Sequence, residues 1–86
     1  MAVRYLVTDT FRIPRRGPVL TGLLMAGQVR NGDTLTVEAT GAPVRVSFVD
    51  LHTRPTAEGL LVGLELDPAD PTPVTAGTVL VSRLQA

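Results

Sequence analysis

Residues 9–33 read DTFRIPRRGPVLTGLLMAGQVRNGD, and this stretch decides the class of fold. A turn containing Pro14 and Pro18 separates two runs of threonine and aliphatic residues, and Asn31-Gly32 then supplies the positive φ angles of a tight turn. Short aliphatic runs bounded by glycine, proline and asparagine indicate β-strands joined by turns. No run keeps a helical period without meeting glycine or proline, so the stretch predicts strands and no helix.

The rest of the chain repeats this alternation of short apolar runs and turns. The pattern predicts an all-β protein with a single domain over residues 1–86, folded as a small closed barrel that leaves no free strand edges. Its six expected strands cover about residues 3–12, 18–26, 33–39, 44–51, 60–66 and 78–83.

Two local features add detail to the predicted barrel. The inward and outward positions alternate over residues 44–48, and the phase changes at Phe48-Val49, so we expect a β-bulge that bends this strand. Gly22 and Gly63 lie inside strands, where a missing side chain permits the close approach of another backbone.

Composition excludes several classes of function. The chain has 86 residues, a net charge of zero and three aromatic residues. It contains no cysteine, which excludes disulfides, thiolate chemistry and cysteine-based zinc sites. All eight basic residues are arginines, and zero net charge argues against strong, sequence-blind binding of nucleic acid, although a local arginine patch remains open. No apolar run reaches the ~20 residues of a membrane span and no signal pattern is present, so we expect a cytoplasmic protein without a membrane partner.

Four segments carry a resemblance that covers essentially the whole chain. DTFRIPRRGPVLTG (9–22), GQVRNGDTLTV (27–37), GLLVGLEL (59–66) and AGTVLVS (76–82) resemble the second domain of elongation factor Tu and related translational GTPases. The resemblance implies a six-stranded Greek-key β-barrel of the translation-factor type. The matching positions are Asp9, Phe11, Ile13, Arg16, Gly17, Val19, Gly22, Gly27, Gly32, Asp33, Gly59, Val62, Gly63, Gly77 and Val79.

The resemblance also implies a function in binding RNA. The nucleotide-binding domain that precedes this barrel in the family is missing from this sequence, and no lysine is available for a P-loop, so we expect a stand-alone, non-enzymatic module. Ribosomal RNA, transfer RNA or a translation-factor complex is then the expected partner, and Asp50 falls on the acidic position beside the tRNA terminus. The expected contact residues are Arg15, Arg16, Asp50, His52 and Arg54.

Other interpretations of these residues remain open. Arg16 can pin its turn by bonding carbonyls or a carboxylate instead of contacting phosphate. His52 is the only histidine, so a histidine-based metal site or catalytic dyad lacks partners, and a simple loop residue is the alternative. We expect no cofactor, no metal and no small-molecule substrate.

A second function class is a protein-interaction module, either a companion or a mimic of a translational GTPase, with no RNA contact. The strands around GLLMAG and GLLVG offer apolar side chains to both faces, whereas a small barrel needs them only inside. Leu24 or Leu61 would then lie in an outer apolar patch for a partner, and the alternative is that coil or loop segments cover and bury them. The chain is either a complete gene product or a domain excised from a longer polypeptide.

Overall fold

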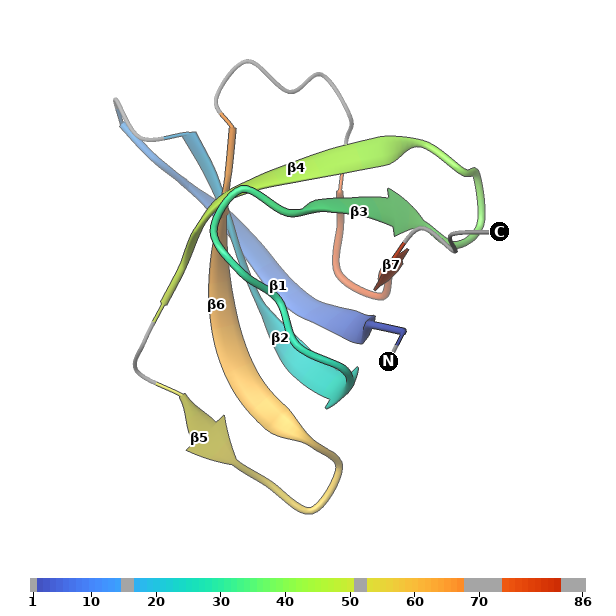
Figure 1. Cartoon of the computed structure of the whole chain (residues 1–86). Coiled ribbons are helices and arrows are strands. Elements are labelled where there is room, and N and C mark those ends of the chain that lie inside the picture. The colour runs from blue at the N-terminus through green and yellow to red at the C-terminus, as the bar shows by residue number, and fades with distance from the viewer. Residues whose placement is uncertain (1, 15–16, 51–52, 68–73, 83–86) are drawn as a thin grey trace.

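The computed structural model describes residues 2–14, 17–50, 53–67 and 74–82. These residues form seven strands and no helix (Figure 1). Arg15, Arg16 and His52, which were expected to contact a partner, lie outside the described residues. The strands are β1 (Arg4–Ile13), β2 (Gly17–Ala26), β3 (Thr34–Val37), β4 (Pro43–Val49), β5 (Arg54–Pro55), β6 (Leu60–Leu66) and β7 (Val79–Ser82).

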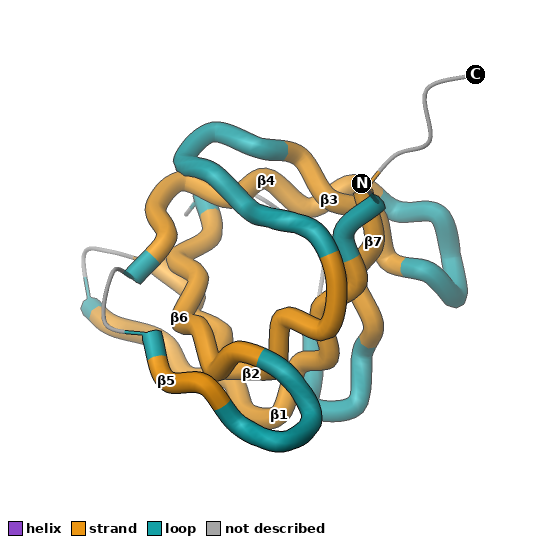
Figure 2. The backbone as a smooth tube through the Cα atoms, turned by 60° about the horizontal axis from the view of Figure 1, so that its bottom comes forward, coloured by secondary structure: helices purple, strands orange, loops and turns teal. Residues whose placement is uncertain are grey.

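Six of these strands close into a ring. Their order is β2-β1-β7-β3-β4-β6, and β6 pairs back onto β2, with every pairing antiparallel. Figure 2 shows the ring from one end, with β5 outside it next to β6. The all-β, six-stranded, barrel-like architecture expected from the sequence is therefore confirmed.

The short strand β5 was not expected, because residues 54–55 lie outside the six predicted strands. It pairs with Leu61 and Leu60 of β6, beyond the part of β6 that pairs with β4. Proline lacks a backbone donor and is tolerated on such an outer strand. Asn31-Gly32 does form a turn, but β2 and β3 are not neighbours in the ring, and the Gly32 N–H donates to the carbonyl of Val46 at 2.8 Å.

The inside of the ring holds the core, and it is built almost entirely from valine and leucine with one tyrosine. Burial of this apolar surface is the main force that stabilises the fold. The most deeply buried side chains are Tyr5, Val7, Leu20, Leu35, Val44, Val46, Leu64, Leu66 and Leu80.

Tyr5 reaches across the core, and a glycine makes room for it. Its hydroxyl donates to the carbonyl of Val62 at 2.7 Å. A Cβ added at Gly22 would meet the carbonyl oxygen of Leu6 and would lie 2.9 Å from Cζ of Tyr5. The prediction that Gly22 permits a close approach is confirmed. Burial raises the pKa of the Tyr5 hydroxyl well above its ordinary value, so the group stays neutral.

Candidate functional site

A β-bulge in β1 changes which side chains face outward. Val7 pairs with Gly22 and Asp9 pairs with Thr21, which leaves Thr8 without a cross-strand partner. The Thr8 hydroxyl donates to the carbonyl of Thr21 at 3.0 Å and holds the bulge. Because side chains alternate along a strand, one extra residue moves every later residue of β1 to the opposite face. Phe11 therefore points outward and stays 49% exposed.

A second bulge does the same in β4. Val46 pairs with Leu66 and Phe48 pairs with Glu65, so Ser47 is the extra residue. The Ser47 hydroxyl donates to the carbonyl of Glu65 at 3.1 Å. Phe48 is thereby turned away from the core and is 43% exposed. The bulge predicted in this strand is confirmed, but it lies at Ser47 and not at the expected Phe48-Val49 step.

The two phenylalanines belong to one row of side chains across four strands. Phe11 pairs with Val19, Val19 with Glu65, and Glu65 with Phe48, so all four lie on the outer face. A pocket of about 440 Å³ lies over this row. We call it the phenylalanine pocket, and its lining residues are Phe11, Ile13, Val19, Thr21, Phe48, Asp50, Gly63, Leu64 and Glu65.

Asp50 lies beside Gly63, in the next row of the same face. Its backbone N–H donates to the carbonyl of Gly63 at 2.9 Å. A Cβ added at Gly63 would lie 3.3 Å from Cβ and 3.5 Å from Oδ2 of Asp50. The missing side chain of Gly63 therefore lets the acidic side chain lie close to the sheet, at the wall of the phenylalanine pocket. A carboxylate has several acceptor positions, so Asp50 can receive hydrogen bonds from a ligand.

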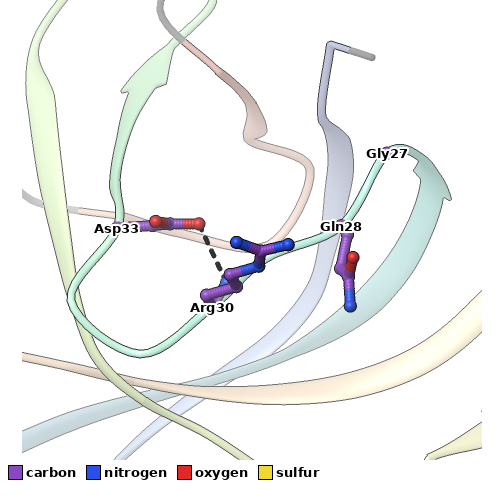
Figure 3. A pocket seen from close by; sticks show the side chains of 4 residues that line it. All are labelled: Gly27, Gln28, Arg30 and Asp33. Atoms are coloured by element: carbon purple, nitrogen blue, oxygen red, sulfur yellow. Dashed lines mark hydrogen bonds between the residues drawn. The ribbon is translucent and has the colours of Figure 1, made fainter.

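A second cavity, of about 600 Å³, lies at the turn between β2 and β3 and is lined by Gly27, Gln28, Arg30 and Asp33 (Figure 3). Its carboxylate is used by the turn itself, because Oδ2 of Asp33 accepts the backbone N–H of Arg30 at 2.8 Å. The Asp33 N–H donates in return to the carbonyl of Arg30 at 3.1 Å. These two hydrogen bonds show that Arg30 and Asp33 stabilise the turn. The phenylalanine pocket, with two exposed aromatic rings, is the stronger candidate site.

The structure places two of the expected contact residues, Asp50 and Arg54. Asp50 lines the phenylalanine pocket, and Arg54 is exposed on β5 opposite Leu61. Leu61 lies two residues from Gly63, which lines the pocket, and Arg54 is not part of the lining. The aromatic side chains at the site were not anticipated. Regular alternation from Tyr5 and Val7 puts Phe11 on the inner face, and only the bulge reverses this.

Leu24 and Leu61 differ in position, although both were considered for an outer patch. Leu24 pairs with Tyr5 and packs against the core. Leu61 pairs with Leu23, one residue out of phase with the inward-facing Val62, so it lies on the outer face and is partly exposed. Leu24 therefore contributes to stability, and only Leu61 belongs to an outer surface.

No protein-family model matches the chain, and no curated protein matches it. Among the described residues, no group of three or more histidine, cysteine, aspartate and glutamate side chains is arranged to hold a metal ion. The described part of the chain also contains no helix long and apolar enough to cross a membrane.

Proposed function

We propose that this protein is a non-enzymatic module that binds single-stranded RNA by seating one unpaired base in the phenylalanine pocket. The observation that carries the proposal is the outward placement of Phe11 and Phe48 in one pocket together with Asp50. Sequence-specific recognition of RNA uses unstacked bases that pack on aromatic side chains and form hydrogen bonds along their edges. The resemblance to the second domain of elongation factor Tu supports the same class of ligand.

Each part of the pocket has a separate role in this proposal. The exposed rings of Phe11 and Phe48 supply apolar faces for the base, and base–aromatic stacking contributes about 1–3 kcal/mol per base. The Asp50 carboxylate accepts a hydrogen bond from an exocyclic amino group, which favours adenine, cytosine or guanine over uracil. Gly63 has no side chain, so the bottom of the pocket stays free for the base.

Electrostatics predict a modest affinity with a weak dependence on salt. The net charge of the chain is zero, so few phosphates are neutralised when RNA binds. Arg54 is exposed on β5, and in this proposal it contacts a neighbouring phosphate. Raising the salt concentration should therefore weaken binding by far less than the 10³–10⁵-fold loss of a protein that contacts about 6–10 phosphates.

The direct test is fluorescence anisotropy with labelled single-stranded oligonucleotides of the four homopolymer types. Phe48→Ala should weaken binding of an adenine oligonucleotide by about 5–150-fold, the equivalent of about 1–3 kcal/mol of stacking. Asp50→Asn should reduce the preference over uracil. Met25→Ala is the matched control, because Met25 is exposed to a similar extent, 49% against 43% for Phe48, but lies outside the pocket lining. Equal affinities of wild type, Phe48→Ala and Met25→Ala would overturn the proposal.

The cellular partner that fits this proposal is ribosomal RNA or the single-stranded end of transfer RNA, in the cytoplasm. Co-sedimentation with ribosomes and gel-shift assays with deacylated tRNA test it. Binding should be weakened in Phe48→Ala and unchanged in Met25→Ala. Retention of both variants by ribosomes after nuclease treatment would favour a protein partner instead.

A further inference from the structure

The turn between β2 and β3 lies against the part of β4 that carries the phenylalanine pocket. Strand β3 pairs with β4 only as far as Arg45, which is opposite Thr34. Beyond Arg45, the edge of β4 that faces away from β6 is bonded by residues 31–33. The turn therefore occupies the place that a neighbouring strand would take.

Among the described residues, three hydrogen bonds join this turn to β4. The Val46 N–H donates to the carbonyl of Asp33 at 2.8 Å, and the Gly32 N–H donates to the carbonyl of Val46 at 2.8 Å. The third bond uses a side chain, because the Val49 N–H donates to Oδ1 of Asn31 at 2.8 Å. This bond lies at the C-terminal end of β4.

Asn31 is well suited to this contact. It precedes Gly32, whose φ of 88° lies in the left-handed region that glycine adopts without strain. Asparagine followed by glycine is a favoured pair in tight turns, and the asparagine carbonyl oxygen accepts hydrogen bonds. The two hydrogen bonds between Arg30 and Asp33 stabilise the turn around it. One short side chain thus joins a stable turn to the end of β4.

Val49, which donates to Asn31, stands between two residues of the phenylalanine pocket. Phe48 precedes it and Asp50 follows it, and both line the pocket. On the opposite edge of this segment, the Asp50 N–H donates to the carbonyl of Gly63 at 2.9 Å. The segment that carries both pocket side chains is therefore held from two sides, by β6 and by Asn31.

We infer that Asn31 is a positioning residue for the phenylalanine pocket. The bulge at Ser47 interrupts the ladder between β4 and β6, which weakens the hold of β6 on this segment. The bond between Asn31 and Val49 supplies a hold from the other side and so fixes the two pocket side chains. This inference rests on the proposed function, since it names a residue outside the pocket lining that controls how the pocket receives a base.

Asn31→Gly and Asn31→Asp form the pair of variants that tests the inference. Glycine keeps the conformational freedom of the turn and removes the acceptor, whereas aspartate keeps an acceptor oxygen. Thr40→Gly is the matched control, because Thr40 is also exposed and precedes Gly41, which has a positive φ. Its hydroxyl accepts the N–H of Ala42 at 3.3 Å. Thr40 lies between β3 and β4, at the opposite end of β4 from the pocket residues.

Amide hydrogen exchange followed by NMR tests the positioning without RNA. One hydrogen bond corresponds to a net factor of about 2–12 in an equilibrium constant. Relative to the core amide of Leu20, the amides of Val49 and Asp50 should exchange at least about twofold faster in Asn31→Gly than in the wild type. They should exchange at the wild-type rate in Asn31→Asp and Thr40→Gly. Unchanged exchange of Asp50 in Asn31→Gly would overturn the inference, and so would equally fast exchange in Asn31→Asp.

Fluorescence anisotropy with adenine and uracil oligonucleotides tests the consequence for binding. A pocket that is formed only part of the time binds with an affinity reduced by that fraction, so Asn31→Gly should bind adenine about 2–12-fold more weakly. Its preference over uracil should also fall, because Asp50 supplies that preference. Asn31→Asp adds a charge that acts on both oligonucleotides alike, so its preference should match the wild type. Thr40→Gly should match the wild type in affinity and preference.

The two experiments separate this inference from the proposed function. A wild type that binds none of the oligonucleotides contradicts the proposed function, and hydrogen exchange at Asp50 then decides whether Asn31 positions the segment. A wild type that binds RNA with an affinity and preference that folded Asn31→Gly retains contradicts this inference alone. Circular dichroism checks that each variant is folded, and Asn31→Ala, which also lacks the acceptor, replaces Asn31→Gly if that variant does not fold.

Discussion

The inner and outer faces of the ring are formed by the same strands, but they differ in how far they bury large apolar side chains. Inside, Tyr5 and Leu64 are fully buried, and the single hydroxyl among them is paired with a carbonyl. Outside, Phe11 and Phe48 remain 49% and 43% exposed. The difference comes from the backbone, because one bulge in each of β1 and β4 turns these rings outward.

At each bulge that turns a phenylalanine outward, a side-chain hydroxyl bonds the neighbouring strand. Thr8 and Ser47 each donate a hydroxyl to the carbonyl of the neighbouring strand at the extra residue. Without the bulges, the regular alternation would send both rings to the core. An exposed aromatic pair produced by two bulges is the kind of device that strands use beside binding sites.

The largest expected effect contrasts two glycines, one on each face. Gly22→Ala should abolish folding, because its Cβ would collide with the carbonyl of Leu6 and the ring of Tyr5. A loss of 4 kcal/mol or more, about the stability of a small domain, is expected. Gly63→Ala should cost only about 1 kcal/mol, since its Cβ would meet Asp50 at 3.3 Å. Urea unfolding followed by circular dichroism measures both.

Gly63→Ala should also lower RNA affinity. Its Cβ displaces Asp50 and raises the floor of the phenylalanine pocket, so RNA affinity should fall by about tenfold or more while the chain stays folded. Equal destabilisation by the two alanine substitutions would mean that the faces do not differ as described.

The next effect concerns the buried hydroxyl of the inner face and its dependence on pH. Burial raises the pKa of Tyr5, so the folded state favours the neutral hydroxyl. The resulting contribution to the free energy of unfolding is complete below about pH 10, the pKa of tyrosine in the unfolded chain. It is lost as pH rises through and above that value. The free energy of unfolding should be level near pH 9 and fall above about pH 10, with a slope approaching 1.4 kcal/mol per pH unit.

The chain offers a clean control for this pH dependence. It contains one tyrosine and no cysteine or lysine, and arginine stays protonated, so Tyr5 is the side chain that titrates in this range. Tyr5→Phe should remove the alkaline fall and cost about 1–2 kcal/mol at neutral pH, because the carbonyl of Val62 loses its donor. Urea midpoints across pH measure both, and a persisting fall in Tyr5→Phe would contradict the assignment.

The bulges give a smaller effect on stability with a larger effect on binding. Thr8→Val and Ser47→Ala each remove one hydroxyl, which should cost about 0.5–1.5 kcal/mol. Because the bulges orient the rings, RNA affinity should fall further than this stability loss explains. Thermal unfolding and anisotropy measure the two quantities. A stability loss with unchanged RNA affinity would show that the hydroxyls do not position the phenylalanines.

The smallest effect is expected at the surface ion pair. Arg4 and Glu38 are 48% and 47% exposed, so Arg4→Gln should lower the unfolding free energy by less than about 1 kcal/mol. The same measurement in high salt should show no difference between the variant and the wild type. A loss above about 2 kcal/mol would show that the pair is more buried than its exposure indicates.

The sequence predicts the ring well for a physical reason. Its turn signals are spaced at strand length, and aliphatic residues alternate clearly in the segments that became β3 and β4. Strand β5 escaped prediction because its two residues are held by pairing with β6 and not by any local preference.

The site is only partly predictable from the sequence. Asp50 was found through a family resemblance, and Gly63 through its place inside a strand. Phe11 was missed as a surface residue, because the bulge at Thr8 depends on how β1 aligns with β2 and not on the order of residues in β1.

Nitrogen–proton correlation NMR spectra, recorded while a short adenine-containing RNA is added to the folded chain, test the central claim most directly. The outer phenylalanine pocket is predicted to be the binding surface, so the largest shifts should fall on the amides of Phe11, Phe48, Asp50 and Gly63. The amides of Arg30 and Asp33, at the other cavity, should not move. Shifts concentrated at Arg30 and Asp33, or no shifts at millimolar RNA, would contradict the account.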